Sequence, residues 1–189
     1  MSQNKIVCMG DSLTDGYGLD ENVRWTNLLS QVLDVEVINS GISGDTTAGM
    51  LNRFYNMAIS FKPNYIIIMG GTNDISMNIP DNFIIANILA MTRLAKHHGI
   101  IAIIGIPTPY FIPDVDSEER QFIDDVRLQS RISAFQKSLI DFAVSDDLAY
   151  IDFSSDMKRS HFMEDGLHPN EEGQKIMAEY AKNCLTMYL

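Results

Sequence analysis

The segment KIVCMGDSLTDG (residues 5–16) determines how the chain can fold. Its first part, Lys5–Met9, is an apolar run that predicts a strand covered on both faces, as in a parallel sheet. Glycine and small polar residues, among them Ser12, follow this strand at once. Ligands of α/β proteins bind beyond the carboxyl ends of the strands, so the residues after each strand are where a functional site is expected.

Four further apolar runs predict a sheet of five strands; they cover residues 35–39, 65–69, 100–106 and 149–152. Longer amphipathic stretches, typical of helices, lie between or after them, at residues 25–33, 46–60, 81–98, 118–145 and 170–187. Asn170 is a suitable N-cap for the last helix, and Gly99 a suitable C′ residue for the third. With right-handed crossovers, this alternation predicts a three-layer α/β/α sandwich with a doubly wound, mainly parallel five-stranded sheet of the flavodoxin-like type.

Length and composition narrow the functional classes. The 189 residues contain no repeat or linker, which predicts one domain over residues 1–189. A net charge of −11 without a basic block argues against a nucleic-acid partner. The apolar runs are shorter than the ~20 residues of a spanning helix, so stable membrane insertion is not expected. No signal peptide is visible and the two cysteines, Cys8 and Cys184, are expected as buried thiols, which predicts a cytoplasmic protein.

Four loops at the predicted carboxyl edge carry the groups needed for acyl transfer by a serine. They are residues 10–16, 39–45, 70–74 and 165–169. A serine hydroxyl needs a neighbouring base, usually histidine, and the histidine needs a carboxylate that orients it. Ser12 and the Asp165/His168 pair, three residues apart, are suitable for these roles. Peptide N–H groups beside glycine and an asparagine side chain are suitable donors to an oxyanion.

The same loops resemble the sequence blocks of the GDSL esterase/lipase family, also called the SGNH hydrolases. GDSL (residues 10–13) is similar to the first block, GTND (residues 71–74) to G-x-N-D, and DGLH (residues 165–168) to D-x-x-H. The resemblance spans nearly the whole chain. It is greatest to the small single-domain bacterial arylesterase-like and thioesterase-like members.

This resemblance implies residue roles. Ser12, Asp165 and His168 would form the catalytic triad. The backbone N–H groups of Ser12 and Gly44 and the side chain of Asn73 would form the oxyanion hole. His161 is a rival base, but it lacks a carboxylate at a matched spacing.

Two apolar, proline-containing loops also leave the functional edge, at residues 75–80 and 107–113. Ile75, Met77, Tyr110 and Phe111 are therefore candidate substrate-binding residues, with packing over the sheet edge as the alternative. No metal-ligand motif and no dinucleotide fingerprint is present, so neither a metal nor another cofactor is expected.

These observations predict a serine hydrolase that cleaves carboxylic esters or thioesters of small to medium acyl groups through an acyl-enzyme intermediate. Its partner is then a small-molecule ester, and a homo-oligomer is possible but not implied. One alternative is a carbohydrate acetylesterase, for which Tyr17, Trp25 and Tyr110 are possible contacts to a sugar leaving group. A more distant alternative is a non-catalytic, flavodoxin-like binding module, which Asp11 and Asp15 disfavour because carboxylates repel a bound phosphate.

Overall fold

Five strands form one sheet in which each neighbouring pair runs parallel. The computed structural model describes residues 4–113 and 124–188. The sheet order is β2-β1-β3-β4-β5, and the strands are β1 (Lys5–Gly10), β2 (Glu36–Gly41), β3 (Tyr65–Met69), β4 (Ile101–Ile106) and β5 (Ala149–Asp152). After β1 the chain turns to one side to form β2 and then to the other to form β3, so β1 lies at the topological switch point where α/β proteins bind ligands.

Side chains of each central strand alternate between two cores because successive residues point to opposite faces. In β1, Val7 and Met9 join the core on one face of the sheet, whereas Ile6 and Cys8 join the core on the other. All five residues of β3 are buried. The run of apolar residues without polar alternation therefore reflects a sheet covered on both faces.

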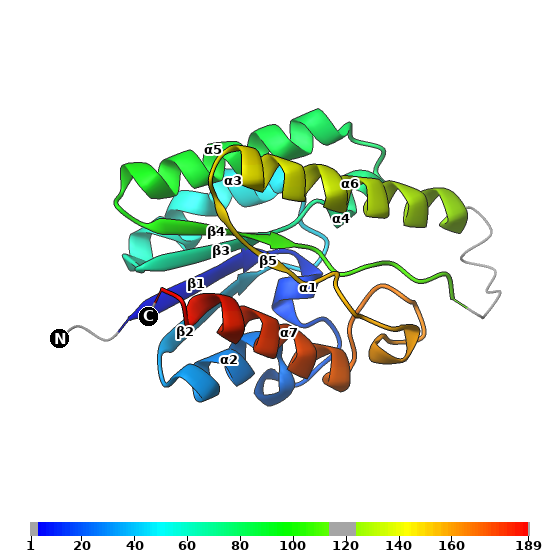
Figure 1. Ribbon diagram of the computed structural model, residues 1–189, viewed down its shortest axis with the longest axis horizontal. Helices are drawn as coiled ribbons and strands as arrows, with labels where there is room; N and C mark the ends of the chain where they lie inside the picture. Colours follow the sequence, from blue (N-terminus) through cyan, green and yellow to red (C-terminus); the bar gives the residue numbers. More distant parts are fainter. Residues whose placement is uncertain (1–3, 114–123, 189) are drawn as a thin grey trace.

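Helices cover both faces of the sheet (Figure 1). One face carries α3 (Thr47–Met57), α5 (Asp81–His97) and α6 (Asp125–Ser145), and the other carries α2 (Trp25–Leu33) and α7 (Glu171–Leu185). Two short helices follow strands directly, α1 (Ser12–Asp15) after β1 and α4 (Thr72–Ser76) after β3. Three single 3-10 turns complete the described elements: η1 (Glu21–Val23), η2 (Ile59–Phe61) and η4 (Arg159–His161).

The predicted architecture is confirmed, with differences at element ends. The helix expected over residues 46–60 ends at Met57, because Ala58 leaves the helical conformation with φ −137°, and η2 follows. The helix expected from residue 118 is described from Asp125, and residues 118–123 lie outside the described part. Asn170 caps α7 and Gly99 follows α5 with φ +72°, as predicted.

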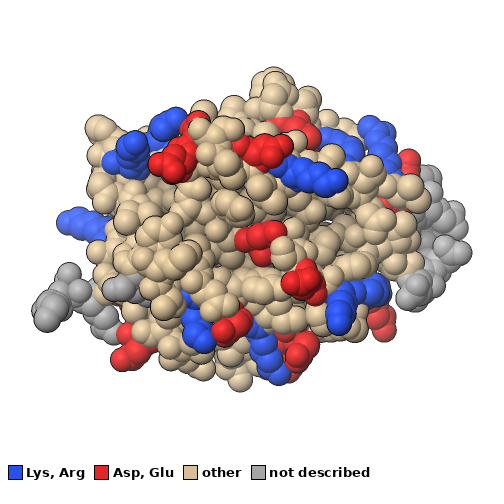
Figure 2. Space-filling view, in the orientation of Figure 1, with Lys and Arg blue, Asp and Glu red and all other residues tan. Residues whose placement is uncertain are grey.

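The sequence predicts two buried cysteine thiols, and the structure differs at Cys184. Cys8 and Cys184 are both free thiols, the first buried and the second half-buried. Lys and Arg side chains are dispersed among Asp and Glu side chains on the face shown in Figure 2. Among the helices of residues 4–113 and 124–188, none is long and apolar enough to cross a membrane.

The end of β2 packs directly against the turn after Ser12. A Cβ atom on Gly41 would lie 2.7 Å from the Asp15 Cα atom and closer still to its backbone N. We expect Gly41→Ala to lower the stability by about 1–3 kcal/mol, the usual cost of overpacking, because backbone atoms must move. Thermal unfolding monitored by circular dichroism checks this, and an unchanged midpoint would show that the contact is not tight.

Candidate active site

Ser12 is the first residue of α1, immediately beyond the carboxyl end of β1. The helix starts there because the carboxylate of Asp11 accepts a hydrogen bond from the backbone N of Leu13 at 2.9 Å. Asp11 is thus the N-cap, and α1 ends at Gly16, which has φ +81°. This short helix holds the Ser12 side chain at the edge of the sheet, 8% exposed.

His168 and Asp165 meet Ser12 from the loop before α7. His168 Nε2 lies 2.9 Å from Ser12 Oγ, and His168 Nδ1 lies 2.6 Å from Asp165 Oδ2. The other carboxylate oxygen of Asp165 accepts hydrogen bonds from the backbone N of Leu167 and of His168. The structure therefore brings together three residues that the sequence places up to 156 positions apart.

The ionised form of Asp165 is stabilised locally. Burial favours the neutral acid, but the hydrogen bonds from the His168 ring, His168 N and Leu167 N outweigh it and lower the pKa of Asp165 to about 2. A carboxylate at Nδ1 selects the imidazole tautomer with the proton on Nδ1, which leaves Nε2 free to accept the proton of Ser12.

The loop after β4 supports the Asp165–His168 turn. Phe111 N donates a hydrogen bond to Gly166 O at 2.9 Å, and Gly166, with φ +70°, lies so close to Phe111 O that a Cβ atom would not fit. The Phe111 ring also packs on Phe162, with ring centroids 5.1 Å apart. Phe111 therefore contacts the loop that carries His168.

Three candidate oxyanion donors lie on the loops of this edge, one each after β1, β2 and β3. Asn73, in the first turn of α4, donates from Nδ2 to Asp45 O at 2.9 Å, with Asp11 Oδ2 at 3.4 Å. Gly44 is exposed and has φ +82°, in the turn after β2. Within the described residues, the backbone N–H groups of Ser12 and Gly44 have no acceptor. All three groups are of the kind that stabilises an oxyanion.

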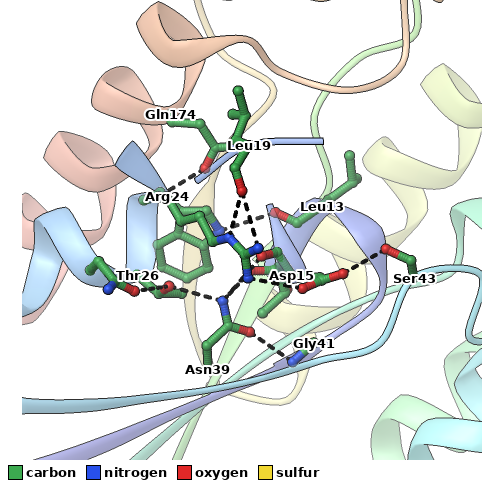
Figure 3. Close-up of polar contacts among 12 residues, drawn as sticks. Leu13, Asp15, Leu19, Arg24, Thr26, Asn39, Gly41, Ser43 and Gln174 are labelled. Atoms are coloured by element: carbon green, nitrogen blue, oxygen red, sulfur yellow. Dashed lines mark hydrogen bonds and ion pairs between the residues drawn. The ribbon is translucent and has the colours of Figure 1, made fainter. Parts of the chain in front are cut away.

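Side chains on both sides of Gly44 fix its turn. Ser43 Oγ donates to Asp15 Oδ2 at 2.7 Å, and Arg24 binds the other oxygen of Asp15 at 3.2 Å (Figure 3). Asp45 on the far side forms a 2.7 Å ion pair with Arg53.

Arg53, in α3, connects this turn to the strand ends. Its guanidinium donates to Gly10 O at 2.8 Å and to Ser40 O at 2.7 Å, besides its ion pair with Asp45. Sequence reasoning did not select Arg53, Asp15 or Arg24. The sequence does contain one indication for Arg53. It lies between Met50 and Met57 on the buried stripe of α3, and a charged side chain in that position needs hydrogen-bond or ion-pair partners.

The candidate substrate-binding residues lie in different surroundings. Ile75 is buried and lines a cavity of about 270 Å³, whose other lining residues are Ser76, Asn78, Asp124, Arg127, Leu128 and Arg131. Met77 is 60% exposed. Tyr110 is buried, and its hydroxyl donates to Asp125 Oδ1 at 2.5 Å.

The rival base His161 takes part in a different contact. Its Nδ1 accepts a hydrogen bond from the backbone N of Lys158, the N-cap of η4, at 3.0 Å. Among the residues that the structure describes, no three His, Cys, Asp or Glu side chains are grouped so that they could hold a metal ion.

Asp11 is a second unusual carboxyl. It is fully buried, and burial raises its pKa to about 7, with the negative charges of Asp74 and Asp45 adding to the effect. The hydrogen bond from Leu13 N and the charge of His168 oppose this rise. The carboxyl thus keeps its proton to a higher pH in the folded chain than in the unfolded chain, where its pKa is about 4.

This shift predicts a pH-dependent effect of Asp11→Asn. A raised folded pKa gives stability that is fully present below about pH 4 and is lost as the pH rises through about 7. We expect the Asn variant, which cannot ionise but can still accept from Leu13 N, to gain stability relative to the parent as the pH rises from about 4 to about 8. Thermal midpoints of both proteins across this range test it, with exposed Asp141→Asn as the control for loss of one carboxyl, and a constant difference would contradict it.

Comparison with known proteins relates this site to a family. Residues 8–176 match the model of the GDSL-like Lipase/Acylhydrolase family. The chain is 29% identical to an arylesterase of Vibrio mimicus over 195 residues, covering 100% of this chain and 91% of the relative. It is 24% identical to thioesterase 1/protease 1/lysophospholipase L1 of Escherichia coli K12, covering 93% of this chain and 80% of that protein.

Comparison with solved structures also relates the chain to acylhydrolases. The structure of a lipase/acylhydrolase from Enterococcus faecalis superimposes with a TM-score of 0.80 at 27% identity, covering 98% of this chain and 97% of the other. The family model spans most of the chain and includes Ser12, Gly44, Asn73, Asp165 and His168. The chain therefore belongs to the GDSL-like lipase/acylhydrolase family.

Proposed function

We propose that Ser12, His168 and Asp165 carry out the ester hydrolysis that membership of this acylhydrolase family assigns to the chain. The observation that carries the proposal is the pair of contacts at His168, 2.9 Å to Ser12 Oγ and 2.6 Å to Asp165 Oδ2. Both are within the range in which a base can take a proton from a nucleophile and be oriented by a carboxylate.

The acylation half follows from this geometry. Ser12 Oγ adds to the carbonyl carbon of the ester or thioester while its proton passes to His168 Nε2. Asp165 stabilises the imidazolium that forms. The tetrahedral intermediate then collapses, the bond to the leaving group breaks, and the leaving group takes the proton from Nε2. The acyl group remains on Ser12 Oγ.

The deacylation half repeats these steps with water. Water adds to the acyl carbon and gives a proton to His168 Nε2, and collapse releases the carboxylic acid and returns the proton to Ser12 Oγ. In both halves the negative oxygen would be bound by Ser12 N, Gly44 N and Asn73 Nδ2. Since Ser12 N and Gly44 N have no acceptor among the described residues, they can donate to the oxyanion without breaking another bond.

The acyl group is proposed to be small to medium in size. Ile75 follows Asn73 by two residues and lines a cavity of about 270 Å³, which we assign to the acyl group. The binding-module alternative is set aside, because the family is one of acylhydrolases. The expected cytoplasmic location stays a prediction, which cell fractionation can test.

Removal of the nucleophile is the direct test. We expect Ser12→Ala to lower the hydrolysis of 4-nitrophenyl acetate and butyrate by at least about 10³-fold, because no other group can form the acyl-enzyme. The variant should unfold at the parent temperature and lose labelling by a fluorophosphonate probe. Ser133→Ala, which changes an exposed serine on α6, is the matched control. A Ser12→Ala variant with parental rates would refute the proposed mechanism.

The oxyanion role of Asn73 has a separate signature. We expect Asn73→Ala to lower kcat by about 10²–10³-fold with little change in KM, because the donor acts on charge that develops only in the transition state. Measurement of both constants with 4-nitrophenyl acetate checks this, and Asn56→Ala on the exposed side of α3 controls for the substitution itself. A rise in KM at constant kcat would assign Asn73 to substrate binding instead.

A further inference from the structure

Three aromatic residues were candidates to contact the leaving group, and the structure separates them. Trp25 is fully buried, and its Nε1 donates to Leu13 O at 3.1 Å. Tyr110 is 4% exposed, with its hydroxyl bound to Asp125. Tyr17 is 51% exposed and contacts the candidate catalytic base. Only Tyr17 of these three is able to meet a molecule bound at Ser12.

The Tyr17 ring packs on His168. The two ring centroids lie 4.5 Å apart with an interplanar angle of 34°. Tyr17 N donates to Ser12 O at 3.2 Å, so the residue is attached to the turn that carries the nucleophile. Its hydroxyl has no hydrogen-bond partner among the described residues, and half of the side chain is open to solvent.

Two glycines keep Tyr17 in this position. Gly16 and Gly18 have φ +81° and φ +74°, a conformation that residues with a side chain rarely adopt. The missing side chain of Gly16 leaves space for Arg24, which is fixed by Asp15 and by Leu19 O. The backbone on both sides of Tyr17 is thus shaped to present a large aromatic ring at the surface, where it adds little to stability.

The chemistry of the reaction determines which part of a substrate meets this ring. His168 Nε2 must give its proton to the leaving-group atom, so the leaving group lies beside His168 when the bond breaks. Because Tyr17 rests on the His168 ring, it borders this side of the site. A flat aromatic leaving group can contact the exposed tyrosine ring edge-to-face or offset-stacked, whereas a short alkyl alcohol offers little surface.

Charge near Tyr17 favours an uncharged leaving group. Asp20 and Glu21 are exposed and follow Tyr17 closely, and Glu164 is exposed beside Asp165. Of the basic residues on these two loops, Arg24 is engaged by Asp15, and Arg159 by the backbone oxygens of Met163 and Glu164. An anionic leaving group would be repelled here, because the protein also carries a net charge of −11.

We propose that Tyr17 is a specificity-determining residue that borders the space in which the leaving group lies. Its ring selects esters of uncharged aromatic alcohols over esters of aliphatic alcohols. The proposal rests on the proposed function, since it requires that His168 act as the acid that protonates the leaving group.

Two substrates with the same acyl group isolate this effect. Phenyl acetate and ethyl acetate give the same acetyl-enzyme, so only their acylation steps differ. We expect Tyr17→Leu to lower the ratio of kcat/KM for phenyl acetate to kcat/KM for ethyl acetate by about 3–10-fold, in line with the strength of one aromatic pair. Tyr17→Phe should keep the ratio within about 2-fold, because the ring and not the hydroxyl makes the contact.

Tyr55→Leu is the matched control. Tyr55 is 61% exposed and also contacts a histidine, His98, with ring centroids 5.9 Å apart, but it lies on α3 outside the site. This variant should keep the parental ratio. Ser12→Ala, measured alongside, should abolish the hydrolysis of both esters; if it does not, the proposed function fails whatever Tyr17 does.

Three results would overturn the role of Tyr17. Equal losses on both esters would show that the ring merely holds His168 in place. A Tyr17→Phe variant as impaired as Tyr17→Leu would assign the effect to the hydroxyl. If Tyr17→Leu lowered kcat/KM for an acetylated xylose more than kcat/KM for phenyl acetate, the Tyr17 ring would be a contact for a sugar leaving group.

Discussion

The parallel register of the sheet is the constraint on which the site depends. Gly10 at the end of β1 pairs with Gly41 at the end of β2 and with Met69 at the end of β3. The three loops that follow these strands therefore start at one level and on one edge, with Ser12, Gly44 and Asn73 within a few residues of their strand ends. A shift of any strand by one residue would also exchange the side chains that face the two cores, so burial of the strands maintains the alignment of the site.

Buried polar groups then tie these loops to one another. Arg53 bonds to the carbonyl groups of Gly10 and Ser40 and to the carboxylate of Asp45. Asp74 accepts hydrogen bonds from both the backbone N and the hydroxyl of Thr47, which joins α4 to the start of α3. Burying such charges gains little net stability, since their desolvation offsets their attraction. They hold the proposed oxyanion donors in place before the substrate arrives, which is the condition under which such donors lower a barrier.

The sequence was sufficient to predict features that depend on composition and order. Short apolar segments identified all five strands, and spacing together with family resemblance selected Ser12, Asp165 and His168, which the structure brings together. Helices α1 and α4 were missed because four or five residues are too few to show a helical period. The hydrogen bonds and ion pairs of Arg53 and Asp15 were missed for another reason. Their partners are backbone carbonyls and loop side chains, which leave no pattern of spacing in the chain.

The three aromatic residues show where local sequence stops being informative. Trp25 begins a helix whose buried stripe continues at Leu29, so its burial follows from helical periodicity. Tyr110 has no such pattern, and it is buried with its hydroxyl bound to Asp125, the first residue of α6. Tyr17 lies between two glycines with positive φ, which indicates a turn but not what the turn contacts. The contact with His168 arises only because the turn after β1 and the loop before α7 meet at the same edge. The proposed specificity on the leaving-group side therefore depends on how two loops converge, whereas the proposed nucleophile, base and orienting carboxylate can be selected from the motifs alone.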